Sequence, residues 1–319
     1  MLRGAVALAA DLRPAATAGA APPGPRRGDV PDPGLRDSPS RPDRRYRAPV
    51  TGSRNWKKRW LPNQHGAWAM LVVPFVVGAL TRQRATGLPL WWIPLAVLWI
   101  VGYCLFAQTV TWIKTPARRR AGLRTPILTY LAVCAASGLA ILALHGLCLA
   151  VWLVGFMPLV VVALALVRNH EERSVTSGMT TVAAACLMFY VLRCGGWPGR
   201  AVGWPPLAPG LHDGLTGLLL YGYFAGTVLH VKSLIRERND PAAARNSVLW
   251  HAAWFAAAVV LCGPWLGTGS PWWIVFFAVA LARTTAMKRL QDNGLPFLPG
   301  TLGVVEIVLS AAAIACGLT

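Results

Sequence analysis

Long apolar stretches alternate with short polar connections through most of this chain. A transmembrane helix needs about 20 largely apolar residues to cross about 30 Å of hydrocarbon. Stretches of this kind lie at about 66–81, 90–113, 126–144, 147–167, 175–192, 214–235, 248–266, 271–287 and 300–318. The pattern predicts an all-α polytopic membrane protein, built as a bundle of about nine transmembrane helices.

The composition supports a membrane domain preceded by a polar tail. Hydrophobic residues are 55% of the 319 residues and charged residues only 13%, which is too apolar for a soluble domain of this length. Residues 1–58 are instead rich in Pro, Ala, Gly and Arg and hold no stretch able to bury itself, so we expect a disordered N-terminal tail. Residues 59–319 are expected to form the transmembrane domain.

The basic residues predict the orientation of the bundle. Alternate connections carry fourteen of them, namely Lys114, Arg118, Arg119, Arg120, Arg124, Arg168, Arg173, Lys232, Arg236, Arg238, Arg245, Arg283, Lys288 and Arg289. The other connections carry four, namely Arg82, Arg84, Arg193 and Arg200. Because cytoplasmic loops are enriched in Lys and Arg, this predicts a multi-pass protein of the cell membrane with its N-terminus inside and its C-terminus outside.

The net charge of +19 does not indicate a nucleic-acid-binding protein. The basic residues of the membrane domain form short clusters beside apolar stretches, without a basic face interleaved with aromatic residues. Loops of this kind lie against anionic headgroups. Membrane lipids, and no nucleic acid, are therefore the expected partners.

Polar side chains gather at the predicted cytoplasmic ends of several helices. In chain order they are Gln64, His65, Lys114, Asn169, Glu172, Arg173, His230, Lys232, Arg236 and Glu237. Their shared side of the membrane predicts one polar chamber that faces the cytoplasm. There His65 would act as an acid or base, or donate to an anionic group. The alternative for His65 is a place at a helix N-terminus capped by Asn63.

The end of the sixth predicted helix is the richest of these segments. At helical spacing His230, Ser233 and Glu237 share one face. His230 is predicted to lie inside the hydrocarbon edge, where an ionisable side chain is costly and usually functional. The alternative is a solvated helix end, with Lys and Arg near the C-terminus favoured by the helix dipole.

Glu306 falls within the last predicted helix, where a carboxylate is also costly. We expect it to face the bundle interior, either paired with a base or protonated, and we group it with His65 and Glu237 as a candidate catalytic residue. The alternatives are a structural pairing with Arg283 or Lys288, or a place at the membrane interface.

A metal site is not predicted. His170, Glu171 and Glu172 have suitable side chains for a divalent ion. Adjacent carboxylates diverge on a helix, however, and no His-x-x-x-His or Glu-x-x-His spacing occurs.

Four segments carry a resemblance to a known family. The chain reads PNQHGAWAMLVVPF, RNHEERSVTSG, HVKSLIRERND and LPGTLGVVE, in that order. Over about residues 60–318 it resembles the YwiC-like family of bacterial integral membrane proteins, for which the resemblance implies no established activity. In layout it is more distantly similar to UbiA-type intramembrane prenyltransferases. Their two Asp-rich cytoplasmic motifs hold Mg²⁺ against a prenyl diphosphate.

The UbiA-type resemblance is incomplete at the residues that would bind metal. Where the first Asp-rich motif is expected, the chain reads QTVTWIKTPARRR, with Gln108 and Lys114 but no carboxylate. Glu237 and Asp240 stand at the second, beside four basic residues. The cofactor is therefore not predicted, and Mg²⁺ is a possible one only by this resemblance. Either Lys and Arg hold the anion without metal, or the scaffold has another use.

Three functions are compatible with this pattern. The first is the binding or modification of an amphiphilic, isoprenoid-like lipid whose anionic head enters the polar chamber. The second is a membrane transporter or permease, although the chain shows no duplicated motif. The third is a non-catalytic membrane scaffold.

Overall fold

The computed structural model describes residue 60 and residues 65–194, 210–265, 269–295, 297 and 299–319. All of these belong to one of two compact units, Gly52–Thr319. The predicted tail, 1–58, lies outside the described residues. Throughout the described ranges the regular structure is helical, which confirms the all-α prediction.

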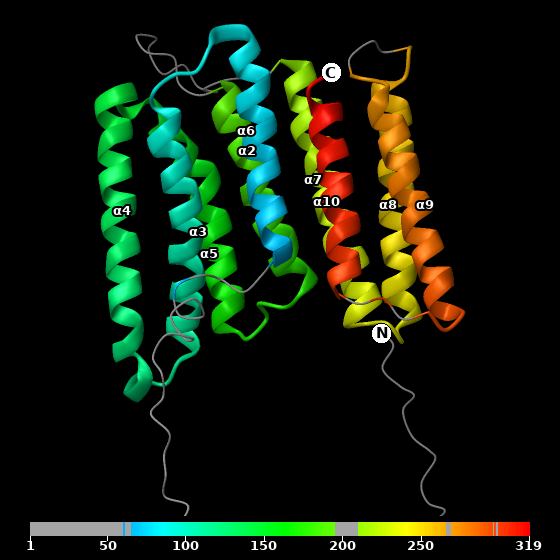
Figure 1. Ribbon diagram of the computed structural model, residues 1–319, viewed down its shortest axis with the longest axis horizontal. Helices are drawn as coiled ribbons and strands as arrows, with labels where there is room; N and C mark the ends of the chain where they lie inside the picture. The colour runs from blue at the N-terminus through cyan, green and yellow to red at the C-terminus, as the bar shows by residue number, and fades with distance from the viewer. Residues whose placement is uncertain (1–59, 61–64, 195–209, 266–268, 296, 298) are drawn as a thin grey trace, which may run out of the picture. The chain divides into compact units, whose positions relative to one another are not determined.

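Nine α-helices of the described residues follow the apolar stretches. Figure 1 shows these helices as a bundle. Their bounds are α2 His65–Thr86, α3 Trp92–Lys114, α4 Ala121–His145, α5 Leu153–Arg168, α6 Val175–Cys194, α7 Leu211–Ile235, α8 Pro241–Cys262, α9 Trp272–Asp292 and α10 Pro299–Gly317. Two short 3-10 helices, η1 Ala117–Arg119 and η2 Gly146–Trp152, precede α4 and α5.

Five segments are long and apolar enough to cross a membrane, by length and composition. They are α3, α6, α7, α10 and the continuous segment Ala121–Arg168, which contains α4, η2 and α5. The segment Ala67–Arg82 is a shorter apolar helix. A multi-pass membrane protein is therefore supported, while the count of nine crossings and their orientation stay predictions.

One helix, α8, begins well before its apolar stretch, because a local cap decides where it begins. α8 begins at Pro241, seven residues before the predicted stretch at 248. Asp240 precedes it, and its carboxylate accepts a hydrogen bond from the Ala242 amide at 2.8 Å. Proline is favoured in the first helical turn, where its missing N–H is not needed. Arg245 and Ser247 consequently lie inside α8.

The prediction for the end of α7 was wrong in one respect. The helix ends at Ile235, and Glu237 lies in the turn that follows. Glu237 therefore does not continue the helical face of His230 and Ser233. The Arg236 and Glu237 amides both donate to the Lys232 carbonyl, at 3.0 and 2.9 Å, which closes the helix at this point.

The helices pack as two groups joined by α2 and α6. On one side, α3 contacts α4 and α5, and α5 contacts α6. On the other side, α7 contacts α8, α9 and α10, while α2 contacts α6 and α10. The largest buried core runs through α2 and α6–α10 and includes Val77, Phe189, Tyr223, Trp273 and Phe277. Large apolar side chains remain exposed elsewhere, as on helices that face lipid, among them Leu128, Leu139, Val154, Val161 and Ile307.

Glycines let α7 approach its neighbours closely. A Cβ atom on Gly222 would lie 2.3 Å from the Trp254 ring of α8, and one on Gly226 would lie 3.0 Å from the His251 Nε2 atom. The Trp250 indole also donates to the Gly222 carbonyl, at 2.9 Å. Small residues at such positions allow close helix packing within a membrane.

Alternate connections lie at the same end of the helix bundle. Lys114, at the end of α3, pairs with Glu172 in the connection from α5 to α6. Gly178 near the start of α6 packs on Val228 near the end of α7. Lys288 of α9 donates to the Arg238 carbonyl in the turn after α7, at 3.3 Å. We call this end, with Lys114, Glu172, Lys232, Glu237, Arg238, Arg245, Lys288 and Asp292, the charged rim.

Candidate functional site

A cluster of polar side chains lies among α7, α8, α9 and α10. It comprises Tyr223, Thr227, His230, Ser247, His251, Arg283 and Glu306, and we call it the buried cluster. At 1.5 Å per residue, Arg283 is about 16 Å from the first residue of α9. His251 is about 15 Å from the start of α8. Both lie near the middle of their helices, far from either end of the bundle.

Glu306 is the centre of the cluster. Its Oε1 atom accepts from Arg283 Nη1, in an ion pair that joins α9 to α10. Its Oε2 atom accepts from the Tyr223 hydroxyl at 3.1 Å and from the Thr227 hydroxyl at 3.0 Å. The exposed fractions are only 7% for the Arg283 side chain and 13% for Glu306. The carboxylate is thus held by three donors from two neighbouring helices.

His251 lies on the other side of Arg283. Its Nδ1 atom is 2.8 Å from the Ser247 carbonyl, which can only accept, so Nδ1 carries the proton of a neutral ring. Nε2 then presents a lone pair to Arg283 Nη2 at 3.4 Å. Gly226 leaves the space on α7 that this imidazole needs. The Ser247 carbonyl on α8 therefore sets the tautomer of His251. Gly226 on α7, which has no side chain, allows the ring to take its position.

His230 and Ser247 complete the cluster. Each is only 1% exposed. The His230 ring is 6.1 Å from the His251 ring between centroids, at 75°. Within the described part of the chain, the His230 Nε2, Ser247 Oγ and Arg283 Nε atoms have no hydrogen-bond partner. Buried polar atoms are usually paired, so three such atoms around His251 are exceptional.

This arrangement suits the handling of protons or charge inside the membrane. Ionisable residues within membrane segments are costly and commonly mark ion pathways or proton relays. The pair also joins α9 to α10, which is a structural role. Buried ion pairs are weak stabilisers relative to apolar packing, because desolvation opposes the attraction.

The charged rim holds separate ion pairs from neighbouring connections. Lys232 pairs with Glu237 at 2.8 Å and Lys288 with Asp292 at 2.7 Å. The hydrogen bond from Lys114, followed by a backbone hydrogen bond within Glu172, holds the pKa of Glu172 below its ordinary value. Glu172, Glu237 and Asp292 are thus each paired with a lysine.

The other predicted rim residues lie at the ends of helices. Asn169 follows the last residue of α5, and Arg173 lies in the connection to α6. Arg236 follows the last residue of α7. All three are exposed. Gln64 and the side chain of His65 lie outside the described part of the structure, and His65 contributes only the first residue of α2.

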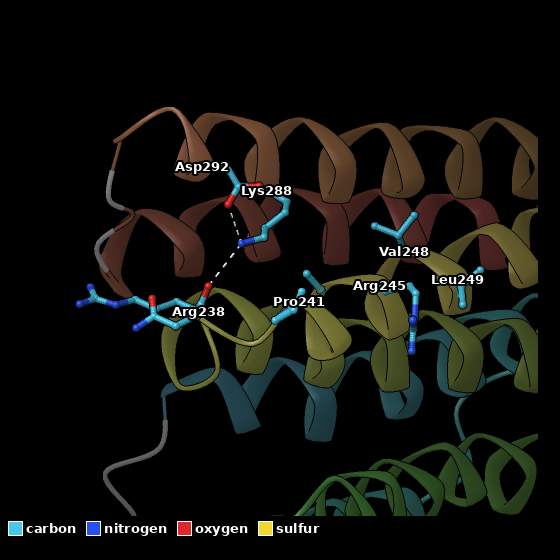
Figure 2. Close-up of a pocket in the computed structure, with 9 residues that line it drawn as sticks. Arg238, Pro241, Arg245, Val248, Leu249, Lys288 and Asp292 are labelled. Atoms are coloured by element: carbon cyan, nitrogen blue, oxygen red, sulfur yellow. Dashed lines mark hydrogen bonds and ion pairs between the residues drawn. The ribbon is translucent and has the colours of Figure 1, made fainter. Parts of the chain in front are cut away.

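A groove opens at the charged rim between α8 and α9. It holds about 740 Å³ and is lined by Arg238, Asn239, Pro241, Ala244, Arg245, Val248, Leu249, Lys288 and Asp292. Figure 2 shows that Lys288 on α9 contacts the Arg238 carbonyl and the Asp292 carboxylate. The guanidinium groups of Arg238 and Arg245 point away from Lys288. No carboxylate of the described residues pairs with either guanidinium.

The sequence alone indicated Glu306 and His230, with Arg283 as an alternative partner, but not His251, Tyr223 or Thr227. Glu306 pairs with Arg283, which was named as its alternative partner. His251 carries the same signal as His230, an ionisable side chain within an apolar stretch, and that signal was sufficient to find it. Tyr223 and Thr227 gave no such signal, because hydroxyl residues are common in membrane helices.

Gln108, which stands where the first Asp-rich motif is expected, makes a contact within the fold. Gln108 is buried, and its Nε2 atom donates to the Trp60 carbonyl at 3.3 Å. Across the described ranges, no group of three or more His, Cys, Asp or Glu side chains is placed to hold a metal ion.

Comparisons with known proteins agree with the predicted resemblance. Residues 61–193, which contain α2–α5 and all but the last residue of α6, match the family model described as YwiC-like protein. The chain is 27% identical over 257 residues to a protein of Bacillus subtilis (strain 168) described as uncharacterized protein YwiC. That match covers 79% of this chain and 93% of the relative. No solved structure matches the chain.

Proposed function

We propose that this chain is a YwiC-like integral membrane protein that binds an amphiphile with an anionic phosphate head in the groove of the charged rim. The single observation behind this proposal is the order of side chains along α8. Arg245 is followed three and four residues later by Val248 and Leu249, on the same helical face. Charge at the helix end followed by apolar surface matches the head and tail of a membrane lipid.

The basic residues of the groove support an anionic head, which their guanidinium groups would meet by turning from the outward directions that Figure 2 shows. Arg238 and Arg245 are exposed and lack carboxylate partners among the described residues, whereas Lys288 is already paired with Asp292. Arg recognises phosphate with its planar fork of donors. Each basic residue near an anionic membrane surface contributes about 1 kcal/mol, or about fivefold in affinity.

The apolar wall supports a tail. Leu249 is 57% exposed beside the groove. Pro241 and Ala244 are small, and they leave room next to the wall. A phospholipid and a prenyl diphosphate share this chemistry, so the two sources must be separated by experiment.

The test measures thermal stabilisation in neutral nanodiscs after addition of phosphatidylglycerol or of a prenyl diphosphate. We expect stabilisation by one or both anionic amphiphiles, but not by phosphatidylcholine. The Arg238→Gln/Arg245→Gln variant should lose it. The charge-matched control Arg124→Gln/Arg168→Gln, with two exposed basic residues outside the groove, should keep it. Equal stabilisation of both variants, or equal stabilisation by phosphatidylcholine, would contradict the proposal.

A second candidate function is transport, which the buried cluster favours. A carboxylate paired with a guanidinium, enclosed by four helices, is typical of sites that bind charged substrates or protons. Uptake into proteoliposomes tests this candidate, because a protein that only binds lipid at its rim transports nothing. The UbiA-type layout, the cytoplasmic position of the rim and the catalytic roles of His65 and Glu237 remain predictions.

A further inference from the structure

The two sides of Arg283 offer it two different acceptors. On one side Glu306 Oε1 accepts from Nη1, and on the other the neutral His251 Nε2 faces Nη2 at 3.4 Å. The acceptor on the His251 side is fixed, because Nδ1 donates to the Ser247 carbonyl. His230 Nε2, on the ring that packs against His251, has no partner within the described ranges. Arg283 thus lies between a carboxylate and two imidazoles.

We infer that the buried cluster is a proton-binding site, in which Glu306 takes one proton and His251, which already accepts from Arg283 Nη2, becomes the remaining acceptor of Arg283. The inference is independent of what the rim groove binds. It gives His230 and His251 a role, whereas an ion pair between α9 and α10 alone would need neither histidine.

The step balances as a proton transfer without redox chemistry. A proton from water forms an O–H bond at Glu306 Oε1, and the hydrogen bond from Arg283 Nη1 to that oxygen breaks. Oε2 becomes the carbonyl oxygen of the acid and still accepts from Tyr223 and Thr227. Arg283 keeps its charge and donates to His251 Nε2. No group is oxidised or reduced.

The groups around Glu306 make it the proton acceptor of the cluster. From α7 they are Tyr223 and His230, from α8 His251, and from α9 Arg283. On α2, Arg82 donates instead to the Leu192 and Arg193 carbonyls, at 3.2 and 2.7 Å. Protonation of an imidazole would place a second cation beside Arg283, which is unfavourable. The other carboxylates of the described residues lie at helix ends or in connections, namely Glu171, Glu172, Asp213, Glu237, Asp240 and Asp292.

Proton binding changes the charge inside the bundle. The Arg283–Glu306 pair is neutral in sum, whereas the protonated site carries one positive charge far from water. Such a charge requires either a counter-anion or a rearrangement that admits water. Proton occupancy is therefore coupled to the packing of α9 against α10.

Infrared difference spectroscopy in nanodiscs tests the inference directly. On acidification the intact protein should develop the C=O stretch of a protonated carboxyl group in an apolar environment, and the band should shift in heavy water. The Glu306→Gln variant should lose this band. Glu172→Gln, which removes a carboxylate of the charged rim, should keep it. A band that persists without Glu306, or no band before the protein unfolds, overturns the proposal.

Three further variants keep the test decisive if the Glu306 variant does not fold. His251→Leu removes the alternative acceptor of Arg283, so the band should appear about one pH unit lower than in the wild type. His251→Gln retains an acceptor oxygen, and its band should stay near the wild-type position. Tyr223→Phe removes one donor to Oε2 and should move the band to higher frequency. Identical titrations of the two His251 variants would overturn the role given to Arg283.

Discussion

Replacing Glu306 with Gln should destabilise the protein strongly at neutral pH. Glutamine has nearly the same shape but leaves the Arg283 charge without its counter-ion, in a place where the guanidinium side chain is only 7% exposed. Breaking a buried ion pair from one side costs about 3–5 kcal/mol, because the remaining charge stays desolvated. Arg283→Met should cost less, since Glu306 can take a proton and keep its hydrogen bonds from Tyr223 and Thr227.

The double variant Arg283→Met/Glu306→Gln makes the reasoning quantitative. With both charges removed, it should be more stable than Glu306→Gln alone, so the two changes are not additive. The free energy of unfolding of all four proteins can be measured by titration with a denaturing detergent from neutral micelles. A double variant as unstable as the sum of the two single variants would refute the coupling. A stable Glu306→Gln protein would show that the ion pair does not form.

Two further outcomes follow from other contacts. Gly222→Ala should cost about 1–3 kcal/mol, because the new Cβ would meet the Trp254 ring at 2.3 Å. Gly138→Ala, with no atom within 4 Å, should be neutral or stabilising in the same thermal unfolding assay. Lys114 holds the pKa of Glu172 below 4.5. Their pair should therefore stabilise the fold above that pH and lose its contribution as the pH falls through the lowered value. Glu172→Gln should remove this part of the pH dependence of the melting temperature, and an unchanged profile would contradict the pairing.

The helices were predictable because the local sequence determines where they form. Apolar length and composition select the segments, and the start of α8 differs because a cap extends this helix past its apolar stretch. Asp240 and Pro241 together form a start signal for α8 that hydrophobicity alone does not contain. Glu237 was placed on α7 because helical spacing was continued past Ile235. Nothing in the spacing shows that the chain turns there.

The candidate site was only partly predictable, because it depends on which helices meet. Glu306 and His230 stand out as ionisable residues in apolar segments, and Arg283 was a possible partner by charge. Their convergence with His251 requires the packing of α7 on α8 and of α9 on α10. Gly226 shows the difficulty, since its role depends on a histidine 25 positions later in the chain, at His251.

The central claim is that the charged rim faces the cytoplasm and the opposite end of the bundle faces outward. Cysteine labelling in whole cells tests this claim most directly. Two single-cysteine variants, Asn239→Cys and Thr319→Cys, are built after the seven native cysteines are replaced with serine. A membrane-impermeant maleimide should label position 319 in intact cells, but position 239 only after permeabilisation. Labelling of both positions under the same condition would place them on one side of the membrane and contradict the claim.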